Sequence, residues 1–424
     1  MPQQRSTTNR RRFLATAAKA SSLFALPMIV PGRVLGLDGG VAASERIALA
    51  GLGIGGRGGY VLGVMMEEPV IQFVAIADPQ KARREGVKQR TEQKYGPGVA
   101  MYRDFREMLP REDIDAVLIA TGDRWHTMAS VYTAKAGKDI YCEKPCSMTI
   151  AESQALADTM RRYNRIYTAG TQRRSILNFQ FAAELCHSGK LGKLTTVHAN
   201  TLNPAVRHDW LPAEPEPGID ECDWNLWLGP TPWRPYNSAY TRGGWRGFFD
   251  FHGGGILEWG AHTVDLCNWA GTNDTLMPVL YEPTPSGCIA TYSNGLKLVM
   301  RDEGWMGLGT CSARYEGEDG WVETGDSGRL EFSSGALRAE QRQFTEAGTS
   351  AVSHVKDWID AIKTRRPANG NANVVAMSHI ICHCAYIAWQ LGRPLEFDPV
   401  KVEFPNDPEA NRMRSRALRD PWHV

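Results

Sequence analysis

Closely spaced glycines near the start of the chain constrain the fold more than any other feature. They follow the apolar segment 47–52 at positions 51, 53, 55, 56, 58 and 59, and a helix-like stretch comes next. Two registers satisfy the spacing G-x-G-x-x-G, one from Gly51 and one from Gly53. Glycine lets a strand turn tightly into a helix whose N-terminal N–H groups face a pyrophosphate. We therefore predict a dinucleotide site built from Gly51, Gly53, Gly55, Gly56, Arg57 and Gly58.

The next apolar segment, 70–77, supports this prediction because an acidic residue, Asp78, ends it. An acid about 20 residues after the glycine loop hydrogen-bonds the ribose hydroxyls of NAD and disfavours a 2′-phosphate. The nearby cations Lys81, Arg83 and Arg84 could meet such a phosphate, so NADP is the second choice. The alternative without a cofactor is a glycine-rich turn in which Asp78 caps a helix.

Strands and helices alternate through the first part of the chain. Apolar runs recur at 113–121 and 138–145, and charged, helix-periodic stretches such as 80–95 separate the runs. This alternation favours right-handed βαβ units around a parallel sheet. We expect an α/β fold in which residues 44–168 form a doubly wound Rossmann domain.

Composition shifts near residue 200. Residues 202–251 are rich in Pro, Trp, Gly and Arg without clear periodicity, which predicts a long loop region in a second domain. Residues 276–345 resemble several strands, with a hairpin turn at Asn294-Gly295. Residues 352–391 are expected to be helical up to Gly392.

Five tryptophans crowd the second domain's loop region: Trp210, Trp224, Trp227, Trp233 and Trp245. Aromatic faces stack on the C–H faces of sugars, so the group is a candidate platform for a sugar substrate. Core packing and loop anchoring explain the same residues, because tryptophan buries a large apolar area.

The N-terminal segment 1–43 has the layout of an export signal. Arg10 and Arg11 precede an apolar run at 23–30 and then Pro and Gly, as in twin-arginine leaders, with a candidate cleavage point at 41–43. The run is too short and broken to span a bilayer. We expect a periplasmic protein without a membrane span after leader removal, or a cytoplasmic one if the leader is not functional. A membrane anchor and a disordered tail are the alternatives.

The net charge and the cysteine content limit the classes of partner and site that we expect. The formal net charge of +1 gives no field that favours nucleic acid, so we expect a small-molecule partner. Nine cysteines without a C-x-x-C pair lie in apolar stretches, as free buried thiols do. His379 and His383 are spaced for metal chelation, but they lie in an apolar helix, and we expect no metal.

Several ordered motifs resemble the Gfo/Idh/MocA oxidoreductases, most closely the exported branch typical of planctomycetes and Bacteroides. The motifs are GIGGRG (53–58), IADP (76–79), IATGDRWH (119–126), YCEKP (141–145), GTQRR (170–174), DWNLWLGPTPWRPYN (223–237) and GGGILEWGAHTVD (253–265). The resemblance covers nearly all of 45–424. It implies a C-terminal α/β substrate domain over 169–395 with an open, mostly antiparallel sheet, and a tail, 396–424, that packs back.

The resemblance also implies site residues. Lys144 would contact the substrate hydroxyl and the nicotinamide region, and Pro145 usually follows a cis bond in this family. His262 would be the acid/base. Glu258 stands where the family usually has Asp, and would contact substrate or orient His262. The other expected cofactor contacts are Thr121, Trp125, His126 and Glu143, and the substrate candidates are Arg173, Asp209, Trp245 and Arg246.

The chemistry of these residue types is consistent with that assignment. Imidazole titrates near neutrality and suits proton exchange with a hydroxyl, while a lysine ammonium suits polarising a carbonyl. Glu258 and His262 are four residues apart, so on a helix they share one face and can hydrogen-bond. From spacing alone such a pair is more often a surface or core contact.

Together these features predict an NAD(P)-dependent oxidoreductase acting on a sugar, a polyol or a related hydroxylated compound. An exported enzyme meets little free NAD, so we expect tightly bound NAD and a redox-neutral cycle. The alternatives are an NAD-dependent glycosidase of the same fold and a non-catalytic sugar-binding protein. The resemblance also implies a homo-oligomer.

Overall fold

The computed structural model describes residues 41–341, 344 and 346–423. The chain divides into two units, 1–46 and 47–424, and the second carries every feature discussed below. In the first unit, η3 (Ala43–Glu45) is a 3₁₀ turn. The arginine pair of the expected leader, Arg10 and Arg11, lies outside the described residues.

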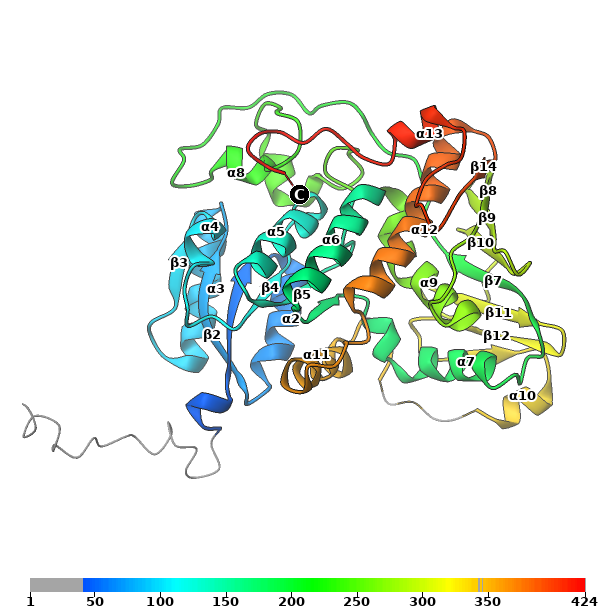
Figure 1. Ribbon diagram of the computed structural model, residues 1–424. Helices are drawn as coiled ribbons and strands as arrows, with labels where there is room; N and C mark the ends of the chain where they lie inside the picture. The colour runs from blue at the N-terminus through cyan, green and yellow to red at the C-terminus, as the bar shows by residue number, and fades with distance from the viewer. Residues whose placement is uncertain (1–40, 342–343, 345, 424) are drawn as a thin grey trace, which may run out of the picture. The chain divides into compact units, whose positions relative to one another are not determined.

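A six-stranded parallel sheet forms the first half of the second unit (Figure 1). Its order is β3-β2-β1-β4-β5-β6, and every pairing is parallel. The strands are β1 (Ile47–Leu52), β2 (Ile71–Ala77), β3 (Ala100–Tyr102), β4 (Ala116–Ile119), β5 (Asp139–Cys142) and β6 (Tyr167–Ala169). Both faces are covered, which explains why a strand such as β4 is buried at every position. The predicted doubly wound sheet is confirmed.

Helices cover the two faces of this sheet as separate layers. One apolar cluster joins the sheet to residues of α2, α3 and α11, and another joins it to α4, α5 and α6. The helices are α2 (Gly56–Met66), α3 (Lys81–Tyr95), α4 (Phe105–Met108), α5 (Asp123–Lys135), α6 (Ile150–Tyr163) and α11 (Val352–Thr364). Chain order reverses between β1 and β4, so a crevice opens at the carboxyl ends of those strands.

The second half contains an eight-stranded sheet of order β13-β12-β11-β7-β10-β9-β8-β14. Only the β7–β10 pairing is parallel among its described pairings, so the expected mostly antiparallel sheet is confirmed. The strands are β7 (Leu194–Asn200), β8 (Leu280–Thr284), β9 (Gly287–Thr291), β10 (Lys297–Arg301), β11 (Ala313–Gly317), β12 (Gly320–Thr324), β13 (Leu330–Phe332) and β14 (Leu395–Glu396). The β9–β10 hairpin turns at Gly295, whose φ is +86°, as predicted.

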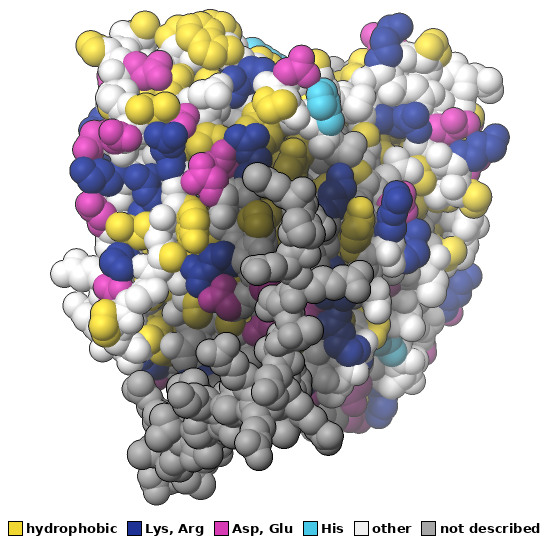
Figure 2. All heavy atoms as spheres, turned by 60° about the vertical axis from the view of Figure 1, so that its left-hand side comes forward, with side chains coloured by type: hydrophobic (Ala, Val, Ile, Leu, Met, Phe, Trp, Pro, Cys, Tyr) yellow, Lys and Arg dark blue, Asp and Glu magenta, His cyan; other side chains and the backbone are white. Residues whose placement is uncertain are grey.

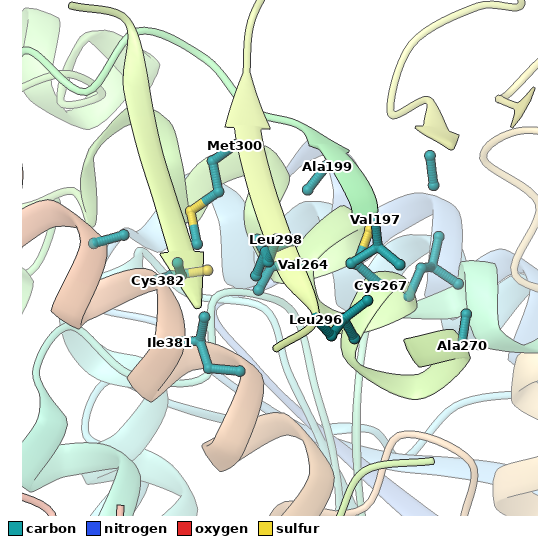
Figure 3. Packing of buried hydrophobic residues seen from close by; sticks show 14 of the residues in the cluster. Val197, Ala199, Val264, Cys267, Ala270, Leu296, Leu298, Met300, Ile381 and Cys382 are labelled. Atoms are coloured by element: carbon teal, nitrogen blue, oxygen red, sulfur yellow. The ribbon is translucent and has the colours of Figure 1, made fainter. Parts of the chain in front are cut away.

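Three helices pack on one face of this sheet: α7 (Leu177–His187), α9 (Gly254–Thr272) and α12 (Ala372–Leu391). Figure 3 shows Val264 of α9 and Ile381 of α12 beside Leu298 of the sheet. This apolar layer fixes α9, and therefore the side chains on its first turns, against the rest of the fold. The remaining short helices are η4 (Gln172–Ser175), α10 (Gly335–Ala339) and α13 (Pro408–Arg412).

The continuous helix expected over 352–391 is wrong. The chain forms α11 and α12 with a break at 365–371, where Pro367 has no N–H to donate and Asn371 caps the second helix through hydrogen bonds from the N–H groups of residues 373 and 374. Gly392 ends α12 with φ +66°, as expected. Within the described residues, α12 is the one helix that is apolar and long enough to cross a membrane. However, 72% of its most apolar stretch is buried inside the protein.

The long loop region 202–251 is held by its own aromatic cluster. Trp224 and Trp227 of α8 (Trp224–Leu228) are buried and stack with ring centroids 4.7 Å apart. A π-helical turn, η5 (Tyr240–Gly244), follows. Packing therefore accounts for Trp224, as the alternative to a sugar platform proposed, whereas Trp210 and Trp233 are more than half exposed.

Residues 218–223 of this region, here called the corner strap, bind the Rossmann half beside the end of β2. The Lys81 N–H donates to the Glu221 carbonyl over 3.0 Å, and the Asp223 N–H donates to the Pro79 carbonyl over 3.1 Å. The Lys81 ammonium adds an ion pair with the Glu221 carboxylate at 3.1 Å. The corner strap thus covers the residues that follow Asp78.

All nine cysteines are free and buried, as predicted. Burial raises the pKa of every one of these thiols. The fold is therefore held together without disulfides.

Acidic and basic side chains intermix on the described part of the surface shown in Figure 2. No extended patch of one sign is visible among the described residues of that face. This distribution is consistent with a small-molecule partner rather than a polyanion.

Candidate active site

A cavity of about 610 Å³ lies at the carboxyl ends of the Rossmann strands. The glycine loop and Asp78 line its Rossmann wall, and Glu258 and His262 of α9 line the opposite wall. Residues from both halves of the chain therefore meet in one crevice, at the position where parallel α/β sheets bind dinucleotides.

The structure decides between the two glycine registers. Gly53 has φ +67°, and a Cβ there would lie 2.3 Å from Thr121 Cγ2. A Cβ on Gly58 would lie 2.5 Å from Ala120 Cβ, so α2 approaches the sheet closely at this residue. Gly55 lies between them at the start of α2 and lines the cavity. The register from Gly53 thus supplies the turn, the approach to the cofactor and the helix–sheet contact that dinucleotide loops need.

Gly51 does not line the cavity. It lies within β1, where an added Cβ would stand 3.0 Å from Phe73 Cζ. Its position indicates packing of the sheet rather than contact with a cofactor. Gly56, Arg57 and Gly58 all line the cavity as expected.

Asp78 occupies the position expected of a ribose-binding acid. It is 4% exposed, lines the cavity directly after β2, and its Oδ1 accepts a hydrogen bond of 2.8 Å from the Gln80 N–H. Burial raises the pKa of its carboxyl to about 6, against the opposing effect of the Gln80 hydrogen bond. A buried carboxylate beside a glycine cradle fits NAD, since it can accept hydrogen bonds from ribose hydroxyls.

This raised pKa predicts that NAD affinity depends on pH. The ribose hydroxyls favour the ionised carboxylate, so affinity should rise with pH through about 6 and then level off. We expect binding about tenfold weaker at pH 5 than at pH 7, measured by calorimetry on cofactor-free protein. Asp78→Asn should bind NAD more weakly and with a flat profile between those pH values. An equally steep profile in Asp78→Asn would show that another group titrates.

The Glu-Lys-Pro segment follows β5 and forms the floor of the cavity. The Lys144-Pro145 bond is cis, as expected. The Lys144 ammonium donates to Glu258 Oε1 and to the Glu258 backbone carbonyl, both at 2.8 Å. Thr121, Trp125, His126 and Glu143 also line the cavity. Pro145 does not; its carbonyl oxygen lies 2.6 Å from His126 Nδ1.

His262 faces the cavity one turn further along α9 than Glu258. It is buried, and its Nδ1 has no hydrogen-bond partner among the described residues. Burial lowers the pKa of His262 well below its usual value, and the positive charges of Arg173 and Lys144 lower it further. The imidazole is therefore neutral at neutral pH and can accept a proton from a bound hydroxyl.

The expected hydrogen bond between Glu258 and His262 is not formed. Glu258 Oε2 lies 2.8 Å from His252 Nε2, while Oε1 accepts from Lys144. Burial alone would raise the pKa of Glu258, but the hydrogen bond from His252 and the charge of Lys144 outweigh burial and lower it. Glu258 and His262 lie on the same face of α9, but the carboxylate of Glu258 binds two donors outside this helix, Lys144 and His252.

His252 is the site residue that sequence reasoning missed. It immediately precedes the Gly-Gly-Gly turn at 253–255, and its proximity to that motif was the available signal. Asp123 at the start of α5 was also missed; it lines the cavity, and its Oδ2 accepts from the Gly253 N–H over 3.3 Å.

The substrate candidates separate into two groups. Arg173, Trp245 and Arg246 line the cavity, and Arg173 is fixed by Asp326 through two hydrogen bonds of 2.7 and 2.6 Å. Asp209 is exposed, pairs with Arg207 at 2.5 Å and lies outside the residues that line the cavity, so its contact with substrate stays a prediction. Five further residues line the cavity that were not predicted: Gln172 and Trp259, which lie in two of the family motifs, and Thr310, Cys311 and Thr349, for which the sequence gave no signal.

The two histidines of α12 that are spaced for metal chelation are committed to other contacts. His379 Nε2 accepts from the Cys146 N–H over 3.0 Å, and His383 Nε2 lies 3.2 Å from Ser147 Oγ. Among the described residues, the one group with metal-ligand spacing is Asp123, His252 and Glu258.

Both halves of the chain match known sequence families. Residues 46–171 match the family described as "Oxidoreductase family, NAD-binding Rossmann fold", and residues 205–424 match "Oxidoreductase family, C-terminal alpha/beta domain". The second match alone covers more than half of the chain.

Individual relatives agree with these matches. Rhizopine catabolism protein MocA of Rhizobium meliloti is 28% identical over 351 residues, which cover 80% of this chain and 94% of that protein. Myo-inositol 2-dehydrogenase of Thermotoga maritima is 29% identical over 131 residues, 31% of this chain and 38% of that protein. A glycosyl hydrolase family 109 protein of Shewanella sp. (strain ANA-3) is 29% identical over 153 residues, 35% of this chain and 33% of that protein.

Solved structures show the same fold. The WlbA dehydrogenase from Chromobacterium violaceum, solved with NADH and UDP-GlcNAcA, has a TM-score of 0.64 at 17% identity. The match covers 88% of this chain and 99% of that one.

Proposed function

Because the chain belongs to the Gfo/Idh/MocA family of oxidoreductases, we propose that it moves a hydride between bound NAD and a CH–OH group of a sugar or polyol. One observation carries this proposal. The Lys144–Glu258 pair and the neutral His262 face the same cavity as the glycine cradle and Asp78. A hydroxyl held there meets a proton acceptor and a cation within one site.

Each of the three site residues has a separate role in alcohol oxidation. The neutral imidazole of His262 accepts the hydroxyl proton, and the Lys144 ammonium stabilises the negative charge that develops on the substrate oxygen. Glu258 holds Lys144 in place through the 2.8 Å hydrogen bond. When bound, the nicotinamide supplies the hydride acceptor and donor. Gly53, Gly55, Gly58 and Asp78 would hold the dinucleotide.

The corner strap supports retention of the cofactor through many turnovers. It crosses the Rossmann half at Pro79–Lys81, beside Asp78, and Arg103 pairs with its Asp223 at 3.4 Å. The Arg83 guanidinium also donates to the Thr241 carbonyl over 3.4 Å, which brings a second segment of the loop region across the cavity. These contacts restrain the segments beside Asp78, and restrained walls would slow release of the dinucleotide. We therefore propose a redox-neutral cycle. The hydride leaves the substrate and later returns to the same molecule or to the compound formed from it.

Two alternative functions are considered for the same site. A glycosidase using transient oxidation has the same need for a retained dinucleotide, and one relative is named as a glycosyl hydrolase. A binding protein would not need Lys144, Glu258 and His262 on facing walls. The intact trio favours an enzyme over a binding protein.

Location and assembly are further parts of the proposal. The Arg10-Arg11 segment supports export through the twin-arginine route to the periplasm. Helices α7, α9 and α12 all pack on one face of the second sheet, and we propose that a homo-oligomer forms through the opposite face.

Recovery of the cofactor tests the proposal first. Protein made without residues 1–43 should release near-stoichiometric NAD(H) on denaturation after prolonged dialysis, measured by mass spectrometry. Aldoses, myo-inositol and methyl β-glucoside, each given without added NAD, should then be screened for turnover. Turnover that consumes added NAD in stoichiometric amounts would refute the redox-neutral cycle. Recovered NADP(H) would overturn the role of Asp78, and a protein with no affinity for NAD would refute the oxidoreductase.

A further inference from the structure

The buried imidazole of His252 has no part in the chemistry described above, although it touches the site. It is 7% exposed and does not line the cavity. Its Nε2 lies 2.8 Å from Glu258 Oε2, and the edge of Trp245 packs near its ring, with centroids 6.1 Å apart. Its hydrogen bond to Glu258 therefore links it to the lining of the cavity.

The hydrogen bonds around His252 define its tautomer. The Gly254 N–H donates to His252 Nδ1 over 3.2 Å, so Nδ1 presents a lone pair. In a neutral ring the proton then resides on Nε2, which donates to Glu258 Oε2. The turn at the start of α9 thus sets the direction of the bond to Glu258.

The two oxygens of Glu258 serve two different donors. Oε2 accepts from His252, and Oε1 accepts from the Lys144 ammonium at 2.8 Å. A carboxylate held at both oxygens cannot rotate freely, and its position fixes that of the ammonium it binds. Resting on the function proposed above, we infer that His252 is a positioning residue that holds Glu258, and through it Lys144, in the reactive geometry.

A metal ion is the competing explanation, because ligand atoms of Asp123, His252 and Glu258 lie within 4.8 Å of one another. Coordination by Nε2 would require its lone pair and a proton on Nδ1. The Gly254 N–H opposes that proton, and the Lys144 ammonium already occupies one oxygen of Glu258. The hydrogen-bonded arrangement therefore explains the cluster without an ion.

The tautomer can be measured without knowing the substrate. Two-dimensional NMR of the full-length holoprotein labelled with ¹⁵N-histidine, assigned by comparison with His252→Gln, should show His252 with its proton on Nε2. Glu258→Gln should shift that resonance, whereas His187→Ala, an exposed control on α7, should not. A proton on Nδ1, or one equivalent of divalent metal in the purified protein, would overturn the inference. So would a resonance unmoved by Glu258→Gln.

Kinetics test the positioning role separately. With whichever of myo-inositol or methyl β-glucoside reduces the bound NAD faster, His252→Leu should lower the single-turnover rate roughly 10- to 100-fold, as loss of a charge-assisted hydrogen bond does. The half-saturating probe concentration and the NAD content should stay unchanged. His252→Gln keeps an N–H donor near the position of Nε2 and should recover most of the rate. Equal losses in His252→Leu and His252→Gln would overturn the inference.

A double substitution makes the coupling explicit. Aspartate at 258 is one methylene shorter and cannot reach Lys144 and His252 together. In the Glu258→Asp background, His252→Leu should therefore change the rate less than about twofold. A full effect of His252→Leu in that background would show that His252 acts elsewhere. If wild-type protein reduces its NAD with neither probe, the proposed substrate class fails, while the NMR result still decides the role of His252.

Discussion

Lys144→Met should lower turnover roughly 100- to 1,000-fold while leaving the protein folded and loaded with NAD. Methionine matches the length and apolar stem of lysine but removes the ammonium that faces the cavity. The loss leaves the developing charge on the substrate oxygen without its cation. The dinucleotide is expected to stay, because the glycine loop and Asp78 that would hold it are untouched. Single-turnover reduction of bound NAD measures the chemical step, and mass spectrometry measures the cofactor content.

The control for this substitution is Lys356→Met, which removes an exposed lysine of α11 that is not among the residues lining the cavity. It should retain full activity. Loss of NAD from Lys144→Met would mean that Lys144 anchors the cofactor rather than the substrate. Activity within twofold of wild type would refute its role and support the binding-protein alternative.

Gly53→Ala should remove NAD binding. A Cβ at Gly53 would lie 2.3 Å from Thr121 Cγ2 and 2.8 Å from the Thr121 Cα, and the backbone φ of +67° strains any L side chain. The loop must then move away from the position that lines the cavity. We expect at least a 100-fold loss in NAD affinity, equivalent to about 3 kcal/mol, and recovery of little or no copurified cofactor.

Gly86→Ala supplies the matched control. Gly86 lies in the exposed part of α3, and an added Cβ there meets nothing within 4 Å. Alanine favours the helix by roughly 1 kcal/mol relative to glycine, so this variant should be slightly more stable and bind NAD normally. If Gly53→Ala kept its cofactor, the strand-to-helix turn could not be the pyrophosphate site.

Local sequence spacing predicted the Rossmann half well. The glycine loop and Asp78 are determined by segments of a few residues, and their positions follow from the strand, turn and helix that carry them. Even the choice between two glycine registers depended on contacts, because the approach of Thr121 to Gly53 helps to distinguish the turn glycine from Gly51, which packs in β1. Spacing identified the motif, and packing assigned the roles within it.

The residues on the α9 side of the cavity were harder to predict from the sequence. Glu258 and His262 share a helix face, but the Glu258 carboxylate hydrogen-bonds Lys144 and His252 instead. Lys144 is 114 residues away in sequence. The corner strap is equally remote, since Lys81 and Glu221 are 140 residues apart. Such pairings depend on how the two halves pack, and no local pattern encodes them. Asp209 shows the opposite case, because its partner Arg207 is only two residues away and the exposed pair lies outside the lining of the cavity.

The break between α11 and α12 shows a different kind of error. Its signals, Pro367 and the capping Asn371, were present in the sequence, but apolar residues continue on both sides and suggested one long helix. Periodicity reports which face is buried and does not report whether the backbone hydrogen bonds continue.

The nine buried thiols have a consequence for where the protein can work. A disulfide-stabilised fold needs an oxidising surrounding to mature, and a fold with accessible thiolates is damaged by one. Here burial raises the pKa of each thiol, as at Cys142 and Cys288, and keeps it from contact with oxidants. The same molecule can therefore cross from a reducing to an oxidising compartment without changing a covalent bond, so its stability should be identical in dithiothreitol and in oxidised glutathione.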